Sequence, residues 1–110
     1  MQKHCLALDL KNDAALIAEY EQYHLKIPIA IDKSIRDAGI TNLEIYRTGN
    51  RLFMILEATD AFSFDKKSKM DAENPDVQAW ETLMWRFQQA LLNAKDGEKW
   101  VVMDKIFSLQ

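Results

Sequence analysis

Several features that mark particular classes of protein are scarce in this sequence. Its 110 residues include a single cysteine, Cys5, so no disulfide can form within the chain, and a reducing compartment is expected. No apolar stretch approaches the roughly 20 residues that span a membrane. The short apolar run at the N-terminus contains Asp9, which does not suit a signal peptide. We therefore expect a cytoplasmic protein.

An excess of positive charge is also missing. The formal net charge is −3, whereas proteins that bind nucleic acid usually present a basic face. The one basic cluster, Lys66, Lys67 and Lys69, lies between Asp65 and Asp71, which is typical of a solvated helix surface. The sequence predicts neither nucleic acid nor a membrane as a partner.

The motifs of the common cofactor and metal enzymes are absent from the sequence. There is no P-loop, no G-x-G-x-x-G, no H-E-x-x-H and no cysteine pair. The two histidines, His4 and His24, share no metal-ligand spacing with a carboxylate pair. We therefore expect no metal and no cofactor, and phosphoryl transfer, metal-dependent hydrolysis and dinucleotide chemistry are all disfavoured.

Apolar and aromatic side chains are plentiful by contrast. Apolar residues make up 48 % of the chain, with three Trp, three Tyr and five Phe but only three Gly and two Pro. A chain of this length suits a single domain, over residues 1–110, with one hydrophobic core. Many rings and few turn residues predict long elements and a pocket lined by aromatic side chains.

Hydrophobic periodicity and capping residues predict four strands and four helices. The strands are expected over 4–10, 43–47, 51–57 and 100–109, and the helices over 13–24, over 28–38, at a short segment capped by Asp60 that carries Phe62 and Phe64, and over 75–92. When each pair of consecutive helices is merged, the order is βαββαβ. This order predicts an α+β fold of the ferredoxin-like type, with helices on one face of a four-stranded antiparallel sheet.

The second face of such a sheet would be left uncovered by the helices. Strand 51–57 is apolar on both sides, because Leu52, Met54 and Leu56 alternate with Phe53 and Ile55. A sheet that is apolar on both faces predicts a homodimer in which two sheets pack together as a barrel-like α/β assembly.

Tyr20 and His24 are a candidate acid–base pair. One helical turn separates them, so they share the face of the helix that carries Leu16. An imidazole exchanges protons at neutral pH, and a tyrosine hydroxyl one turn away can orient a substrate oxygen or share the proton. The same spacing also occurs on amphipathic helices that only pack, so the spacing alone leaves both interpretations open.

Trp80 and Glu81 are a second candidate pair. The apolar face of an indole ring suits the C–H face of a sugar, and a carboxylate accepts hydrogen bonds from hydroxyl groups. A tryptophan on a core-facing helical stripe more often belongs to the core, so this indication of a carbohydrate site is weak by itself. Trp85 and Trp100 are expected to be structural.

Five segments, in their order and spacing, resemble the L-rhamnose mutarotase family over nearly the whole chain. They are 19–24 (EYEQYH), 42–46 (NLEIY), 50–57 (NRLFMILE), 76–80 (DVQAW) and 103–109 (MDKIFSL). The resemblance implies a small cytoplasmic sugar 1-epimerase with a dimeric ferredoxin-like fold. It also implies a monosaccharide substrate and no requirement for a cofactor.

The resemblance implies roles for five residues. The family's proton-donating histidine falls on His24, and its sugar-contacting tyrosine on the same helix falls on Tyr20. Its paired tryptophans fall on Trp80 and Glu81, and a second sugar-contacting tyrosine falls on Leu43. The family's His-x-x-x-Trp-Pro-Glu run, at 24–30 here, lacks its tryptophan and glutamate. Because the pair is kept while the pocket differs, we expect the same reaction on a different 6-deoxy-L-hexose, with L-fucose favoured over L-rhamnose.

The expected reaction interconverts the α and β anomers of a pyranose by ring opening, rotation about C1–C2 and closure on the other face. His24 would make one of the proton transfers, and Tyr20 would orient the sugar or assist. Two alternatives remain open. One is a cofactor-independent small monooxygenase of the same fold, which would consume oxygen with a polyphenol. The other is a dimer that binds sugar without accelerating anomer exchange.

Overall fold

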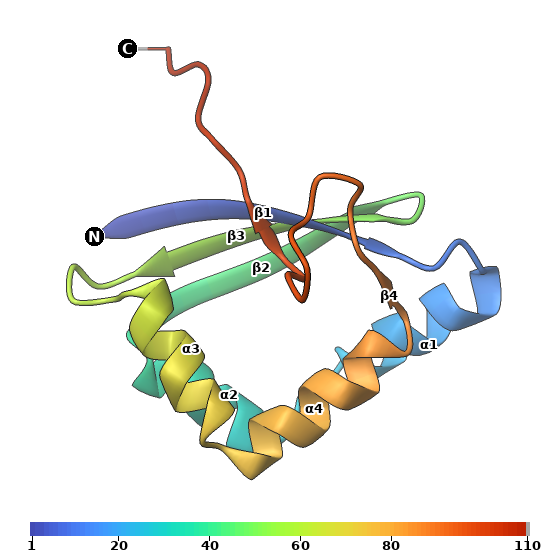
Figure 1. Ribbon diagram of the computed structural model, residues 1–110, viewed down its shortest axis with the longest axis horizontal. Helices are drawn as coiled ribbons and strands as arrows, with labels where there is room; N and C mark the ends of the chain where they lie inside the picture. Colours follow the sequence, from blue (N-terminus) through green and yellow to red (C-terminus); the bar gives the residue numbers. More distant parts are fainter. Residues whose placement is uncertain (110) are drawn as a thin grey trace.

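The computed structural model of the protein describes residues 1–109, in which helices cover one side of an antiparallel sheet (Figure 1). The strands are β1 (Gln2–Leu10), β2 (Ile40–Thr48), β3 (Arg51–Ala58), β4 (Gln88–Gln89) and β5 (Val101–Val102). The helices are α1 (Ala14–Tyr23), α2 (Ile29–Asp37), α3 (Phe64–Ala72) and α4 (Pro75–Trp85).

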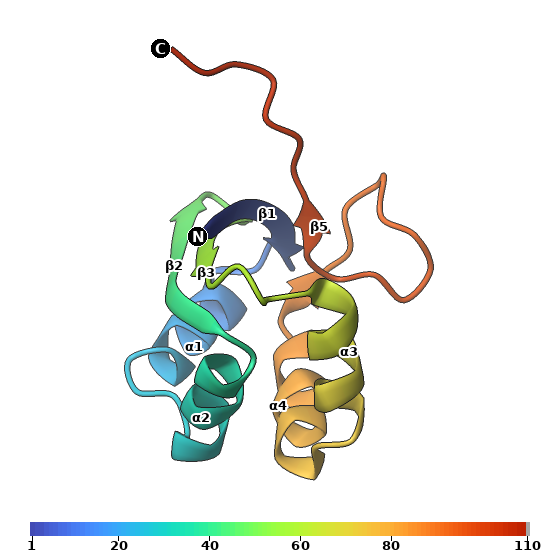
Figure 2. The same cartoon turned by 90° about the vertical axis from the view of Figure 1, so that its left-hand side faces the viewer.

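The strands are arranged in the order β2-β3-β1-β4, and β5 also pairs with β1. This is the strand order of the ferredoxin-like βαββαβ plan, so the α+β class predicted from the sequence is confirmed. Helices α1 and α2 make the first crossover, and α3 and α4 make the second. Figure 2 shows the two helix pairs side by side below the sheet.

Side chains alternate between the two faces of the sheet along the central strands β1 and β3, and this alternation determines which residues form the core. In β1, Leu6, Leu8 and Leu10 point toward the helices and are buried. Leu6 pairs with Met54 of β3, and Leu8 pairs with Leu52, so the two strands present one continuous apolar surface. The residues between them face the other side, which none of the helices in the described part of the chain covers (Figure 1); this side is called the open face below.

Local capping sets most helix starts as predicted. The Asp13 side chain accepts a hydrogen bond from the Leu16 amide at 3.0 Å, and Asn74 caps α4 ahead of Pro75. The expectation for Asp60 is wrong. Helix α3 begins at Phe64 and is capped by Ser63, while Asp60 pairs with the N-terminal amine.

The predicted helix over 75–92 is too long. Helix α4 ends at Trp85, and Gln88–Gln89 pair with Leu10 and Asp9 of β1 as the short strand β4. The Lys11 amide also donates to the Phe87 carbonyl at 2.8 Å. Pairing with the free edge of β1 therefore replaces the next turn of the helix, although the apolar spacing suits a helix.

The predicted strand over 100–109 is mostly wrong. Only Val101 and Val102 form β5, and the Met103 amide adds one further bond to the Cys5 carbonyl at 2.7 Å. Continued pairing would place Lys105 opposite Lys3, and like charges at paired positions destabilise a sheet. The C-terminal tail, residues 103–109, instead leaves the sheet on the side away from the helices (Figures 1 and 2).

None of the helices within residues 1–109 is long and apolar enough to cross a membrane.

Leu8 tests the importance of the central strand. Its side chain is 0 % exposed, so Leu8→Ala should lower the free energy of unfolding by about 2–5 kcal/mol. Leu92→Ala is the matched control, because Leu92 is fully exposed and should change it by less than about 0.5 kcal/mol. Urea unfolding followed by circular dichroism measures both, and equal effects would contradict the assigned core.

Candidate active site

A cavity of about 460 Å³ lies between the helices and the helix-facing side of the sheet. Residues of the two hydrophobic clusters of the core line it, among them Leu6 and Met54 from one cluster and Met84 from the other. Trp100 packs against both clusters and also lines the cavity, so it is part of the wall as well as of the core.

Three of the five predicted site residues line this cavity: Leu43 from β2, and Trp80 and Glu81 from α4. Leu43 also lines an open groove that contains His24. The aromatic ring of His24 lies 5.6 Å from that of Trp80, measured between centroids, in an edge-to-face arrangement. Trp80 therefore connects the cavity to the end of α1.

Tyr20 and His24 lie together at the end of α1, as their spacing predicts. Their ring centroids are 4.4 Å apart. Tyr20 is 4 % exposed and packs edge-to-face against Phe87, whereas His24 is only partly buried. The structure thus brings Tyr20, His24 and Trp80 into one aromatic group beside the cavity.

The helix end determines which nitrogen of His24 carries hydrogen. His24 Nδ1 lies 2.8 Å from the Tyr20 backbone oxygen. A carbonyl oxygen only accepts hydrogen bonds, so Nδ1 is the donor. In the neutral ring, Nε2 is therefore the nitrogen with the free lone pair, and it can accept a proton from a hydroxyl group.

Burial determines the protonation of Tyr20. Removal from solvent raises the pKa of the Tyr20 hydroxyl above its usual value of 10.0, and a side-chain hydrogen bond with Gln88 opposes this to a smaller extent. The phenol is therefore protonated at neutral pH. It can donate a hydrogen bond to a ligand but is unsuited to act as a base.

Glu81 has a basic neighbour that the sequence did not indicate. Lys99 Nζ donates to the Glu81 backbone oxygen at 3.2 Å and lies 5.2 Å from the centroid of the Trp85 ring. Partial burial lowers the pKa of Lys99, and the Glu81 carboxylate opposes that shift. Glu81 and Lys99 both line the cavity, so they offer an acceptor and a donor to a polar ligand.

Further polar residues in the cavity wall were also missed. Lys67, expected on a solvated helix surface, is partly buried and forms an ion pair with Asp71, and both line the cavity. Their spacing of four residues on a helix could have indicated this pair. Gln88, on β4, is the other missed residue.

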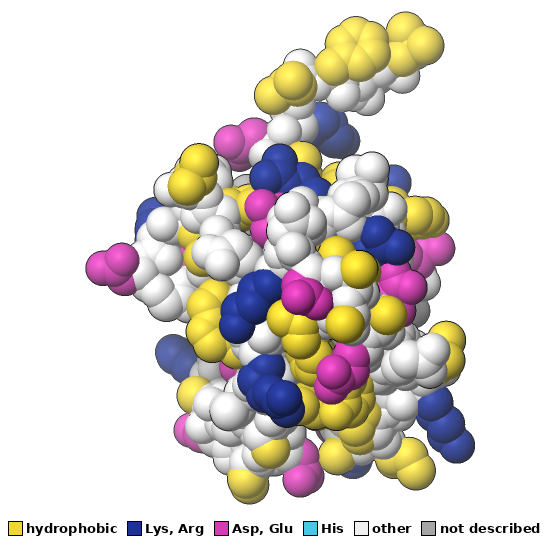
Figure 3. Space-filling model, turned by 90° about the vertical axis from the view of Figure 1, so that its right-hand side faces the viewer, with side chains coloured by type: hydrophobic (Ala, Val, Ile, Leu, Met, Phe, Trp, Pro, Cys, Tyr) yellow, Lys and Arg dark blue, Asp and Glu magenta, His cyan; other side chains and the backbone are white. Residues whose placement is uncertain are grey.

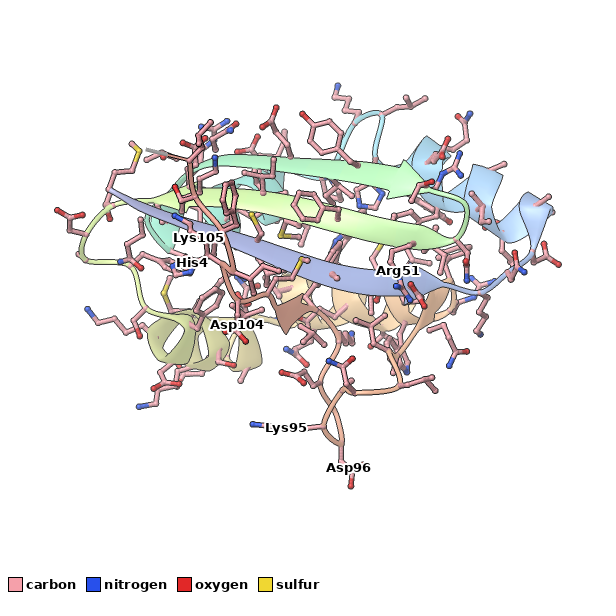
Figure 4. The ribbon with its side chains drawn as sticks, turned by 90° about the horizontal axis from the view of Figure 1, so that it is seen from above. His4, Arg51, Lys95, Asp96, Asp104 and Lys105 are labelled. Carbon is pink, nitrogen blue, oxygen red and sulfur yellow. The ribbon has the colours of Figure 1, made fainter. Side chains whose placement is uncertain are left out.

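The remaining histidine lies elsewhere. His4 packs against Phe62 and Phe64, and its Nε2 is 2.9 Å from Gln2 Oε1. Figure 4 shows His4 toward the opposite end of the sheet from Arg51. Within residues 1–109, no group of three or more His, Cys, Asp or Glu side chains is placed to hold a metal ion.

Comparison with known proteins gives one family match and two relatives. The model of the L-rhamnose mutarotase family matches residues 3–109. An L-fucose mutarotase of Xanthomonas campestris pv. campestris is 45 % identical over 111 residues, which cover 99 % of this chain and 89 % of the relative. A UPF0734 protein of Dictyostelium discoideum is 32 % identical over 115 residues, covering 98 % of this chain and 90 % of that protein.

Solved structures of other proteins share the fold at low sequence identity, among them the following two. An L-rhamnose mutarotase from Formosa agariphila aligns with a TM-score of 0.73 and 15 % identity over 100 % of both chains. Tetracenomycin F2 cyclase from Streptomyces glaucescens, a type-II polyketide cyclase, aligns with a TM-score of 0.62 and 14 % identity over 100 % of this chain and 98 % of the cyclase. At these identities the likeness concerns the fold alone.

The burial of Tyr20 predicts a loss of stability at high pH. Its folded-state pKa lies above the unfolded value, so its contribution is fully present below pH 10.0 and is lost as the pH rises through the folded pKa. Urea unfolding of the wild type and of Tyr20→Phe between pH 8 and pH 11 measures this (a range set about the unperturbed tyrosine value). The wild type should lose more stability than Tyr20→Phe over that range, and parallel curves would contradict the burial argument.

Proposed function

Because this chain belongs to the L-rhamnose mutarotase family and is an isomerase that interconverts sugar anomers, we propose that its substrate is L-fucose in preference to L-rhamnose. The choice of sugar is supported by the 45 % identical relative, which is an L-fucose mutarotase. The observation that carries the proposed mechanism is the position of His24, which lines the open groove and is in ring contact with Tyr20 and with Trp80 of the cavity wall.

The pyranose binds in the cavity with one face against Trp80. The volume of about 460 Å³ lies in the range of small-molecule sites, and its wall combines rings with a few polar side chains. Glu81 accepts a hydrogen bond from a sugar hydroxyl, and Leu43 contributes an apolar contact from the sheet side. L-Fucose and L-rhamnose differ in the orientation of their hydroxyls at C2 and C4, so the placement of such acceptors selects between them.

His24 carries out the proton transfers in this mechanism. Its Nε2 accepts the proton of the anomeric hydroxyl, O1–H, while the C1–O5 bond breaks, and the imidazolium then gives the proton to O5. The products are the open-chain aldehyde and the neutral ring of His24. Rotation about C1–C2 turns the other face of the carbonyl toward O5, and the same steps in reverse form the other anomer.

Tyr20 assists as a hydrogen-bond donor. Because burial keeps its hydroxyl protonated, it can donate to a sugar oxygen and hold C1 near His24. The Tyr20 carbonyl meanwhile accepts a hydrogen bond from His24 Nδ1, which orients the imidazole.

The protein also acts as a homodimer in this proposal, with the open face of the sheet as the interface. At its centre are the partly buried side chains of Cys5, Ala7, Phe53 and Ile55, beside the exposed ring of Tyr46. The charged residues Lys3, Asp9, Arg51 and Glu57 lie toward the ends of the same face, which is the usual arrangement of an interface core and rim.

The C-terminal tail supports this interface. Ile106, Phe107 and Leu109 are between 75 % and 95 % exposed, and Figure 3 shows the hydrophobic atoms of the tail standing clear of the body. The tail leaves on the side of the open face, where a facing copy would lie. Burying each such side chain is worth about 1.5–3 kcal/mol, so we place the tail of each subunit against its partner.

Loss of His24 should abolish the acceleration of anomer exchange. His24→Ala removes the proposed proton carrier, and we expect the catalysed rate to fall about 10²–10⁴-fold. His4→Ala is the matched control: within residues 1–109, His4 lies behind Phe64 of the cavity wall and lines neither the cavity nor the groove that contains His24, so it should leave the rate unchanged. NMR saturation transfer on L-fucose and on L-rhamnose measures both variants.

The same measurement separates the alternatives. If the wild type accelerates exchange of neither sugar, the proposed function is wrong. A thermal shift in L-fucose without acceleration would then favour a non-catalytic sugar-binding dimer. If His24→Ala retains the wild-type rate, the family assignment stands but the role of His24 does not.

Polar residues in the tail should weaken the dimer. In sedimentation equilibrium we expect the wild type to show twice the 12.8 kDa chain mass. The double variant Ile106→Asp with Phe107→Asp should raise the dimer dissociation constant at least about 100-fold, because both side chains lose their burial in each subunit. Lys105→Ala is the control in the same segment. A wild type that stays monomeric at micromolar concentration would exclude this interface.

A further inference from the structure

Gln88 is a buried polar side chain that the proposed mechanism does not use. It is 6 % exposed, it lines the cavity, and its Oε1 has no hydrogen-bond partner within residues 1–109. A buried acceptor without a donor carries the whole cost of leaving water, and such groups are rare in native proteins. An amide kept in this state at the wall of a cavity points to a donor that arrives with a ligand.

The sheet register determines where Gln88 points. Strand β4 pairs Gln88 with Leu10 and Gln89 with Asp9. Paired residues of an antiparallel sheet share a face, so Gln88 is directed to the helix side with Leu10, and Gln89 is directed to the other side. The sequence therefore contains two adjacent glutamines of which one faces the cavity and the other is exposed.

Gln88 also lies next to the aromatic group of the site. The ring of Phe87, the residue before Gln88, packs edge-to-face against the Tyr20 ring at 6.2 Å between centroids. The unpaired Oε1 at the cavity wall is therefore close to the residues of the proposed mechanism.

We propose that Gln88 is a sugar-binding residue whose Oε1 accepts a hydrogen bond from one ring hydroxyl. This inference rests on the proposed function and deepens it, because it assigns a second hydroxyl acceptor in addition to Glu81. A sugar without a hydroxyl at this position leaves Oε1 buried and unpaired. Sites of this kind discriminate strongly against such sugars.

Gln88→Met tests the proposal, with Gln89→Met as the matched control. Methionine fills a similar volume without an acceptor. The Michaelis constant for L-fucose, from saturation transfer at increasing sugar concentration, should rise about 3- to 10-fold in Gln88→Met. It should stay unchanged in Gln89→Met.

A series of deoxy sugars identifies the hydroxyl. We expect one of 2-deoxy-, 3-deoxy- and 4-deoxy-L-fucose to give the same Michaelis constant with Gln88→Met as with the wild type, because neither then makes the bond. With the other two sugars, the Michaelis constant of Gln88→Met should exceed that of the wild type by the same factor as with L-fucose. The proposal is overturned if the substitution raises the Michaelis constant equally for all three deoxy sugars, or if it does not raise the Michaelis constant for L-fucose.

Thermal unfolding separates a binding role from a structural one. Without sugar, Gln88→Met should have the wild-type melting temperature or a higher one, because the unpaired acceptor is gone. A lower melting temperature would show that Gln88 supports the fold and would overturn the proposal. If the wild type has no mutarotase activity but is stabilised by L-fucose, the proposed function fails, while a smaller stabilisation of Gln88→Met by L-fucose still supports the role of Gln88.

Discussion

The pairing of β1 along both of its edges is the constraint on which the site depends. Strand β3 holds one edge, and β4 and β5 share the other. Because Gln88 pairs with Leu10, the Gln88 side chain lies at the cavity. Because Val101 pairs with Ala7, the preceding residue, Trp100, is held in the cavity wall. A slip of one residue along β1 would turn Gln88 to the open face, because side chains alternate along a strand. The polar residues in the cavity wall thus depend on the register in which β4 and β5 pair with β1.

A second constraint is the way in which α1 ends. The last carbonyls of a helix have no partner within it, so they are available to a side chain. His24, just beyond Tyr23, uses its Nδ1 to satisfy the carbonyl of Tyr20. One bond therefore closes the helix, selects the tautomer of the imidazole and holds it against the Tyr20 ring. In the proposed mechanism the proton carrier needs no further support, because the helix end that makes it possible also orients it.

The parts of the fold that depend on neighbours in sequence could be predicted, and those that depend on distant pairing could not. The Asp13 cap and the Tyr20–His24 contact are local, and both are present. The end of α4 was misplaced because the apolar spacing through Phe87 is the same whether the helix continues or β1 captures the chain. Gln88 and Lys99 could not be predicted for the same reason. Spacing within the sequence does not indicate which residue of β1 pairs with which residue of the C-terminal segments, and this pairing brings both side chains to the cavity.

The cavity itself has a thermodynamic consequence for so short a chain. Hollow space forfeits the dispersion contacts that a filled core would make, and a buried amide acceptor without a partner adds to that loss. A domain of this size is stable by only about 5–15 kcal/mol, so both losses are large on that scale. The apolar open face and the exposed Phe107 offer compensation, because their burial requires only a second copy of the chain. In the proposed homodimer, the burial of these surfaces offsets the stability that the core loses to the cavity in which the sugar binds.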